Sequence, residues 1–201
     1  MKKIVLVAIS LLGFTTINAQ DQLIKISPFH FFDGTFNMSI EKSIKSDYTI
    51  NLTGGVHLVE DGWNYDNQKG ATAEIQIRKY LINWDEKDMS GIYVAPYGKL
   101  AYFRYHDEYA YYTWDYDDMG NIISEDWWNE TRDASVKQYN VGILIGTQYI
   151  ISDVISLDMF FGGGIQYADV SGSPDYFDGF PLGRFYTGII PKIGFNFGVK
   201  F

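Results

Sequence analysis

The segment spanning residues 106–133 has the highest density of functional groups in the chain. It holds nine acidic residues and seven tyrosines or tryptophans, against one arginine and one histidine. Aromatic faces flanked by carboxylates can bind sugars or cationic groups, or anchor a protein partner. The structural alternative is a hairpin that prolongs two strands and turns at residues 118–121. The surface-binding candidates are Trp114, Tyr116, Trp127 and Trp128.

Part of the same segment follows the spacing of a calcium-binding loop. Asp115 and Asp117 would be the first and third positions, Gly120 the sixth and Asp126 the twelfth. Met119 occupies a position that needs an oxygen ligand, and no helical pattern flanks the segment. We therefore expect no metal site and no cofactor.

The elements that must position these residues show a period of two. In residues 188–201, Ile189, Ile193 and Phe197 alternate with Lys192 and Asn196. This alternation is typical of a β-strand between an apolar and a polar environment. Eight such segments predict an all-β fold, a closed antiparallel eight-stranded up-and-down transmembrane β-barrel. The predicted strands are residues 23–31, 35–43, 48–58, 71–81, 92–105, 138–149, 155–167 and 188–201.

The predicted connections alternate in length. Short ones follow the even-numbered strands, and longer ones follow the odd-numbered strands, except for a tight Asp33-Gly34 turn after the first. This is the arrangement of bacterial outer-membrane barrels. It places both termini in the periplasm and the long loops outside. The short connections are residues 44–47, 82–91 and 151–154, and the long ones are 59–70, 106–134 and 168–187.

One face of the predicted strands carries charges. Eight strands enclose an interior that side chains just fill. An unpaired charge there costs several kcal/mol, so the charges must pair. Either the pairs fill the barrel structurally, or they exchange partners as the gate of a narrow path. Lys25, Glu41 and Lys200 also face inward, and the predicted lumenal ion-pair network is centred on Glu74, Arg78, Lys99, Asp158 and Lys192.

The opposite face carries aromatic residues at two heights. Tyr139 and Tyr149 lie ten residues apart, which in a tilted strand spans roughly 25 Å, the height of a barrel's apolar band. Trp84 and Tyr48 would join the periplasmic girdle. Tyr102, Tyr167 and Phe185 would join the outer one. Three prolines fall inside predicted strands and count modestly against closure, since each removes a hydrogen bond: Pro28, Pro96 and Pro191.

The start of the chain predicts export. Lys2 and Lys3 precede an apolar run at residues 4–14, and cleavage after Ala19 would make residues 1–19 a signal peptide and 20–201 the barrel domain. The run is too short for a membrane helix. The absence of cysteine excludes lipoprotein acylation and disulfides. Loss of the two lysines takes the formal charge from -9 to -11, which argues against nucleic acid as a partner.

Together these patterns resemble the small outer-membrane β-barrel families of Bacteroidota, including domains of unknown function, and the architecture is similar to the OmpA transmembrane domain. The segments that carry the resemblance are residues 17–20, 74–80, 93–99 and 191–201. It implies contact with outer-membrane lipid and with the barrel-assembly machinery. In such proteins a terminal aromatic residue, preceded by apolar residues at alternate positions, is the assembly signal. Here Phe197, Val199 and Phe201 match that pattern.

The sequence leaves several functions open. A structural or surface-interaction role is the main expectation, with an extracellular protein or glycan as the partner of residues 106–133. A narrow pore and a soluble, lipocalin-like binding barrel are the alternatives. A lipid-modifying enzyme would need a nucleophile and a base, and only His106, with Asp107, Glu108 or Ser135, could serve. No nucleophile motif accompanies it, so we expect no catalytic residues.

Overall fold

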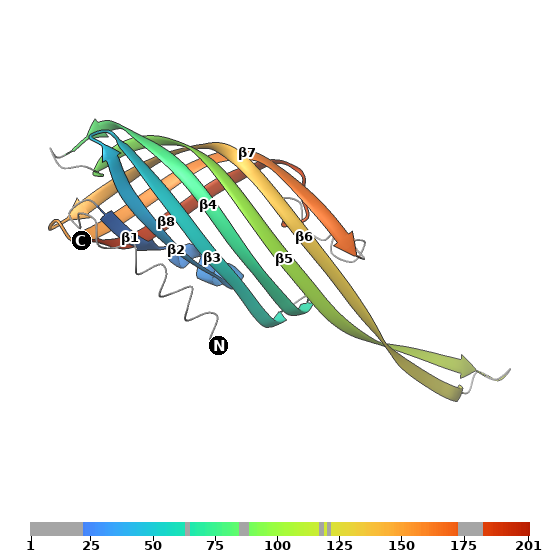
Figure 1. The fold of residues 1–201 in the computed structure, drawn as a ribbon. Helices are drawn as coiled ribbons and strands as arrows, with labels where there is room; N and C mark the ends of the chain where they lie inside the picture. The colour runs from blue at the N-terminus through green and yellow to red at the C-terminus, as the bar shows by residue number, and fades with distance from the viewer. Residues whose placement is uncertain (1–21, 63–64, 85–88, 117–118, 120–121, 173–182) are drawn as a thin grey trace, which may run out of the picture.

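The computed structural model describes residues 22–62, 65–84, 89–116, 119, 122–172 and 183–201, which form a closed barrel (Figure 1). Each strand is antiparallel to the next, and the ring closes where Leu23 pairs with Lys200 and Ile26 with Phe197. The predicted closed, antiparallel, eight-stranded up-and-down fold is confirmed. The strands are β1 (Gln22–Ile26), β2 (Thr35–Lys45), β3 (Tyr48–Gly62), β4 (Tyr65–Asn83), β5 (Gly91–Tyr116), β6 (Ile122–Ile151), β7 (Ile155–Gly172) and β8 (Gly188–Lys200).

The two ends of the barrel differ. At one end, which we call the turn end, lie residues 46–47, 84, 89–90 and 152–154 together with the start of β1 and the C-terminus. The backbone N–H of Phe201 donates to the carbonyl of Gln22 there. The other end, the loop end, holds the remaining connections. Within the described residues, no helix has the length and apolar character needed to cross a membrane.

The first strand is shorter than predicted. β1 ends at Ile26, and Pro28–Asp33 forms a 3-10 helix, η2, so the predicted strand to residue 31 is wrong. Proline favours the first position of such a turn, because its φ is already fixed near the helical value and because the N–H group it lacks would have no hydrogen-bond partner there. The predicted tight turn is also wrong. Gly34 instead ends η2 with φ 74°, a conformation that glycine adopts without strain.

The wall of the barrel is apolar outside and polar inside. Inward positions carry buried asparagine, glutamine, serine and charged side chains, whereas outward positions carry large exposed apolar ones. A soluble barrel has the opposite polarity, because its core is apolar and its surface is wet. The exposed outward residues include Leu52, Val56, Ile75, Ile77, Leu100, Val141, Ile143, Ile145, Met159, Phe161, Ile165, Ile189 and Ile193.

Strand pairing continues further than the alternation suggested. The expected loop at 59–70 is mostly strand, because β3 reaches Gly62 and β4 begins at Tyr65. The prolines do not prevent closure. Pro96 lies in a gap of the β4–β5 pairing, between the Gln76–Tyr97 and Lys79–Val94 pairs, and the register is the same on both sides of the gap. Pro191 lies in the part of β8 that β1 does not reach.

Aromatic rings inside the barrel lie against glycines of neighbouring strands. A Cβ atom at Gly146 would overlap the Tyr93 ring, and one at Gly194 would overlap Phe160. Both rings are buried. The glycines on the inward face therefore make room for rings that fill the lumen.

Candidate functional site

Four fully buried charges meet inside the barrel near the turn end. They are Lys25 of β1, Glu41 of β2, Arg78 of β4 and Asp158 of β7. The Lys25 ammonium donates to Glu41 Oε2 at 2.5 Å and to Asp158 Oδ2 at 3.0 Å. The Arg78 guanidinium donates to the same two carboxylates at 3.0 and 2.9 Å. Each cation thus bridges both anions, and this four-charge cluster is electrically neutral.

Neutral polar groups complete the four-charge cluster. Tyr80 donates its hydroxyl hydrogen to Glu41 Oε1 at 3.0 Å, and Tyr93 donates to Asp158 Oδ1 at 2.7 Å. The Gln148 carbonyl accepts from both cations, and its amide donates to Tyr80 and to the Met89 carbonyl. Hydrogen bonds from all sides are what make a buried ion pair tolerable. Further donors are Thr49 to Glu41 and Asn196 to Asp158.

A second ion pair, between Glu74 and Lys192, lies outside this cluster. The Lys192 ammonium also sits 4.1 Å from the Tyr97 ring centroid and 5.7 Å from that of Phe160. Lys99 is the cross-strand partner of Glu74, and among the described residues it forms no ion pair.

The residues predicted as one lumenal network therefore separate. Arg78 and Asp158 come together in the four-charge cluster, Glu74 and Lys192 form the separate pair, and Lys99 stands apart. Lys25 and Glu41 were assigned to the inward face but not to the network. Alternation tells which face a side chain occupies but not its height, which depends on the register between strands. Nothing in the sequence indicated that Gln148 would bond to both cations of the four-charge cluster.

The acidic aromatic segment is a two-stranded hairpin that projects beyond the barrel (Figure 1). β4 pairs with β5 up to His106, and β7 pairs with β6 from Ala134 onward. Beyond these points, within the described residues, β5 and β6 pair only with each other. Residues 107–116 and 122–133 are called the projecting hairpin below.

The predicted binding residues are divided between the two faces of the projecting hairpin. Trp127 lies directly opposite Tyr112, whose ring stacks on Trp114 with centroids 6.4 Å apart. All three are about half exposed or more. Trp128, opposite Tyr111, occupies the other face. Tyr112 was not among the candidates, although its position two residues before Trp114 in a strand places it on the same face. The side chain of Tyr116 lies outside the described residues.

The base of the projecting hairpin carries the candidate histidine. His106 Nδ1 lies 2.8 Å from Asp133 Oδ1, and its Nε2 lies 3.6 Å from a Glu108 oxygen. The hydrogen bond with Asp133 raises the pKa of His106. No described hydroxyl group hydrogen bonds to the ring. Among the described residues, no three His, Asp or Glu side chains are placed to hold a metal ion, and Asp117 and Gly120 of the calcium-like spacing lie outside them.

The outer surface shows two aromatic groups. At the turn end Trp84 lies 5.8 Å from Tyr149, and towards the loop end Tyr139 lies 6.3 Å from Tyr167. The prediction that Phe185 joins the outer aromatic girdle is wrong. Its ring packs against buried Tyr105, because the inward side chains of Gln138 and Gln166 donate to the carbonyls of Arg184 and Tyr186 and hold this segment at the lumen. The predicted assembly-signal residues Phe197, Val199 and Phe201 are partly exposed, two of them on the strand that closes the ring.

No family model and no curated protein matches this chain. Among solved structures, the chain is similar to the N-terminal β-barrel domain of Pseudomonas aeruginosa OprF. The two share 12% sequence identity over 90% of this chain and 98% of that domain, with a TM-score of 0.39. So low an identity transfers no residue's role, and the roles proposed below rest on the geometry of this chain.

Proposed function

We propose that this protein is an integral outer-membrane barrel with a structural role, whose lumen is sealed and whose projecting hairpin is a surface for contact with a partner. The inverted polarity of the wall carries the proposal. Large apolar side chains point outward along the strands, while the four-charge cluster is buried inside. Exposed apolar surface on this scale is stable in lipid and is a strong aggregation hazard in water.

The closed ring of strands also provides the backbone hydrogen bonds that a bilayer-spanning fold requires. Backbone N–H and C=O groups find no water in the hydrocarbon region, so only helices and closed barrels cross it. All eight strands pair on both sides at some point along their length. The aromatic pairs Trp84–Tyr149 and Tyr139–Tyr167 suit the two interfaces of such a span.

The proposed orientation follows from the two ends. The start of β1, the C-terminus and the short connections lie at the turn end, which in outer-membrane barrels faces the periplasm. The projecting hairpin would then face outside. Outer-membrane lipid and the assembly machinery would be the partners of the barrel in the envelope. The resemblance to Bacteroidota and OmpA-like barrels, and the signal peptide at residues 1–19, stay predictions. Residues 1–21 lie outside the described part of the chain.

Migration in SDS gels tests the membrane assignment. Protein from isolated outer membranes should run as a compact band without heating and shift after boiling, as a barrel that resists SDS does. Recovery only from the soluble periplasmic fraction, with no shift, would overturn the proposal. A soluble lipocalin-like barrel would then be the better description.

The sealed lumen has its own test, because a narrow pore is the alternative. The four-charge cluster, with Tyr80, Tyr93, Leu23 and Met89 around it, fills the turn end with buried side chains. Planar bilayers containing the purified protein should therefore show no conductance steps. Regular steps that disappear when the protein is omitted would show an open path and refute the sealed lumen.

The partner surface follows from the composition of the projecting hairpin. Half-exposed rings of Tyr112, Trp114 and Trp127 lie on a ribbon rich in carboxylates, a combination that attracts cationic groups. Oligolysine should quench tryptophan fluorescence of the folded protein, and salt should weaken the effect. The control replaces residues 109–130 by Asn-Gly, which keeps the Glu108–Thr131 pair and closes it with a tight turn. Equal oligolysine binding by both proteins would refute the hairpin as the surface.

The proposal includes no catalysis. His106 contacts two carboxylates and no described nucleophile. Replacement His106→Ala should leave the lipid A and phospholipid profile of the cell unchanged. A changed profile would identify an enzyme instead.

A further inference from the structure

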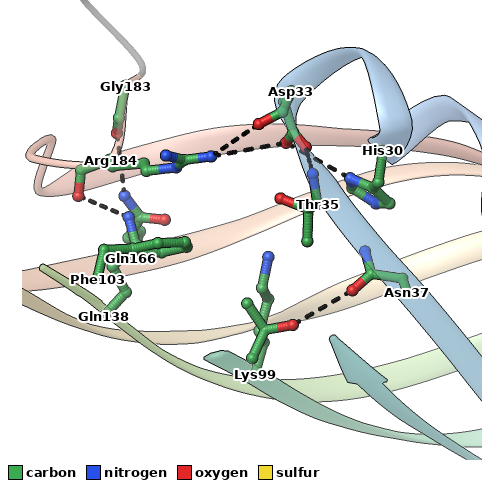
Figure 2. Close-up of a pocket in the computed structure, with 11 residues that line it drawn as sticks. His30, Asp33, Thr35, Asn37, Lys99, Phe103, Gln138, Gln166, Gly183 and Arg184 are labelled. Carbon is green, nitrogen blue, oxygen red and sulfur yellow. Dashed lines mark hydrogen bonds and ion pairs between the residues drawn. The ribbon is translucent and has the colours of Figure 1, made fainter. Parts of the chain in front are cut away.

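A polar pocket of about 200 Å³ lies in the loop half of the barrel (Figure 2). η2 and β2 contribute one wall, with Asp33 and Asn37. β5 and β6 contribute another, with Lys99 and Gln138, and Arg184 comes from the segment before β8. Its volume is below the 300–1,000 Å³ of pockets for drug-sized ligands, so it admits only a small molecule.

The charges around the pocket favour an anion. Lys99 and Arg184 are cationic, and Asp33 is the one carboxylate among the lining residues. Partial burial raises the pKa of Asp33, but hydrogen bonds with His30 and Thr35 and the charge of Arg184 outweigh it and lower that pKa to about 2. The lysine, arginine and aspartate of the lining therefore carry one excess positive charge, in a protein whose formal charge is -9.

Arg184 is held firmly at the rim of the pocket. Its guanidinium lies 4.3 Å from the Phe103 ring centroid and contacts the His57 ring nitrogens at 3.0 and 3.2 Å. It also donates to Gln68 Oε1 at 3.2 Å. These contacts fix where the positive charge stands before any ligand arrives, which reduces the cost of ordering on binding.

Two donors inside the pocket have no partner among the described residues. The ammonium group of Lys99 points into the cavity, as Figure 2 shows, and forms no hydrogen bond or ion pair there. Its cross-strand neighbour Glu74 is already bonded to Lys192 and to Gln76. Asn37 accepts a hydrogen bond from Thr72, which leaves its NH₂ group for a ligand.

We propose that this pocket binds a small hydroxylated carboxylate of monosaccharide size, a sugar acid. Lys99 would take the carboxylate in a charge-assisted hydrogen bond, and Asn37, Gln138 and Thr35 would meet the hydroxyl groups. The four-charge cluster closes the barrel at the turn end, so the ligand is held and not passed through.

Titration calorimetry of the folded full chain in detergent, with three probes, tests the ligand class. D-glucuronate should bind at least about tenfold more tightly than D-glucose, since the loss of one charge-assisted hydrogen bond has this effect. Inorganic phosphate should bind more weakly than D-glucuronate. Equal binding of glucose and glucuronate would refute the anion site, equal binding of phosphate would refute the part played by the hydroxyl groups, and no binding of any probe would overturn the proposal.

Matched charge variants test the assigned residue. Lys99→Gln should lower glucuronate affinity at least about tenfold, whereas Lys99→Arg should keep most of it. The control is Lys137→Gln, which removes the same charge from the outward face of β6, next to Gln138. The heat-dependent gel shift confirms that each variant is folded. Equal affinity in the Lys99→Gln and Lys137→Gln proteins would overturn the proposal, and so would loss of binding in Lys99→Arg equal to that in Lys99→Gln.

Discussion

The four-charge cluster and the projecting hairpin use the same residue types in opposite surroundings. In the cluster, Glu41 and Asp158 are fully buried and each is bonded to two cations and to neutral donors. On the hairpin, Asp126 and Glu130 are exposed, and Glu130 has one described cationic partner, Arg132 at 3.3 Å. A carboxylate thus holds the barrel together where water is excluded and remains accessible where water is present.

Stability and binding should therefore depend on different regions of the protein. Removing a partner from a buried ion cluster leaves a charge that nothing solvates, so the barrel should be sensitive there. Removing a side chain from an exposed ribbon disturbs few contacts, so the hairpin should tolerate change and show its role only with a partner present.

The strongest test of the comparison substitutes one arginine in each region. Arg78→Leu leaves Lys25 alone with two buried carboxylates and should destabilise the barrel by about 3–5 kcal/mol. Arg132→Leu, on the hairpin, should change stability by less than about 1 kcal/mol. Urea unfolding in lipid vesicles, followed by the gel shift, measures both. Equal effects would remove the distinction between the regions.

Loss of a single buried hydroxyl group should have a smaller effect. Tyr80→Phe leaves Glu41 and Gln148 each without one hydrogen bond and should cost about 1–3 kcal/mol in the same assay. Tyr112→Phe on the hairpin should stay within about 0.5 kcal/mol of the parent protein. If Tyr80→Phe also stays within that range, the neutral groups around the cluster are not needed to satisfy it.

Two exposed tryptophans should differ in the same way outside the lumen. The Trp84 ring packs at a tilted angle against Tyr149 at the turn end, and Trp84→Ala should lower stability by about 0.5–1.5 kcal/mol. Trp127→Ala should leave stability within about 0.5 kcal/mol but weaken oligolysine binding. A loss of stability in Trp127→Ala as large as that in Trp84→Ala would show that the hairpin supports the barrel.

The smallest expected effect is electrostatic and lies at the hairpin base. Because Asp133 raises the pKa of His106, Asp133→Asn should bring that pKa down towards the ordinary histidine value of 6.5. The stability that the protonated His106 ring contributes to the hairpin is fully present below pH 6.5 and is lost as the pH rises through the folded-state pKa. Histidine resonances followed by NMR across pH 5–9 measure the shift. An unchanged pKa in Asp133→Asn would show that the pair does not persist in solution.

Much of the barrel could be predicted because alternation is a local signal. Ile189 to Phe201 show the period of a strand without any knowledge of their neighbours, and the same holds for the segment around Tyr139. The exception near Pro28 is also local. Pro28 begins the 3-10 helix η2, and the alternation of residues around it did not distinguish this turn from a continued strand.

The composition of the buried cluster could not be predicted, because it depends on register. Lys25 meets Asp158 only because β1 pairs with β8 and β8 with β7 at particular heights. Tyr93 alternates in phase with Lys99, and Phe160 with Asp158, so the period of two places both rings inside the wall but does not give their height. Phe185 shows a different ambiguity, since an aromatic residue outside a strand suits both a membrane interface and a packed interior.

The four-charge cluster also bears on the order in which the barrel is built. Its members come from β1, β2, β4 and β7, and Lys25 donates to Asp158 across 133 residues of chain. In a partial sheet without β7, Lys25, Glu41 and Arg78 leave one positive charge unbalanced on the surface that becomes the lumen, and a partial sheet without β1 lacks Lys25. Neutralisation therefore coincides with the final steps of ring closure. We expect Arg78→Leu to accelerate unfolding while hardly slowing the early steps of insertion, as is typical of contacts that form late.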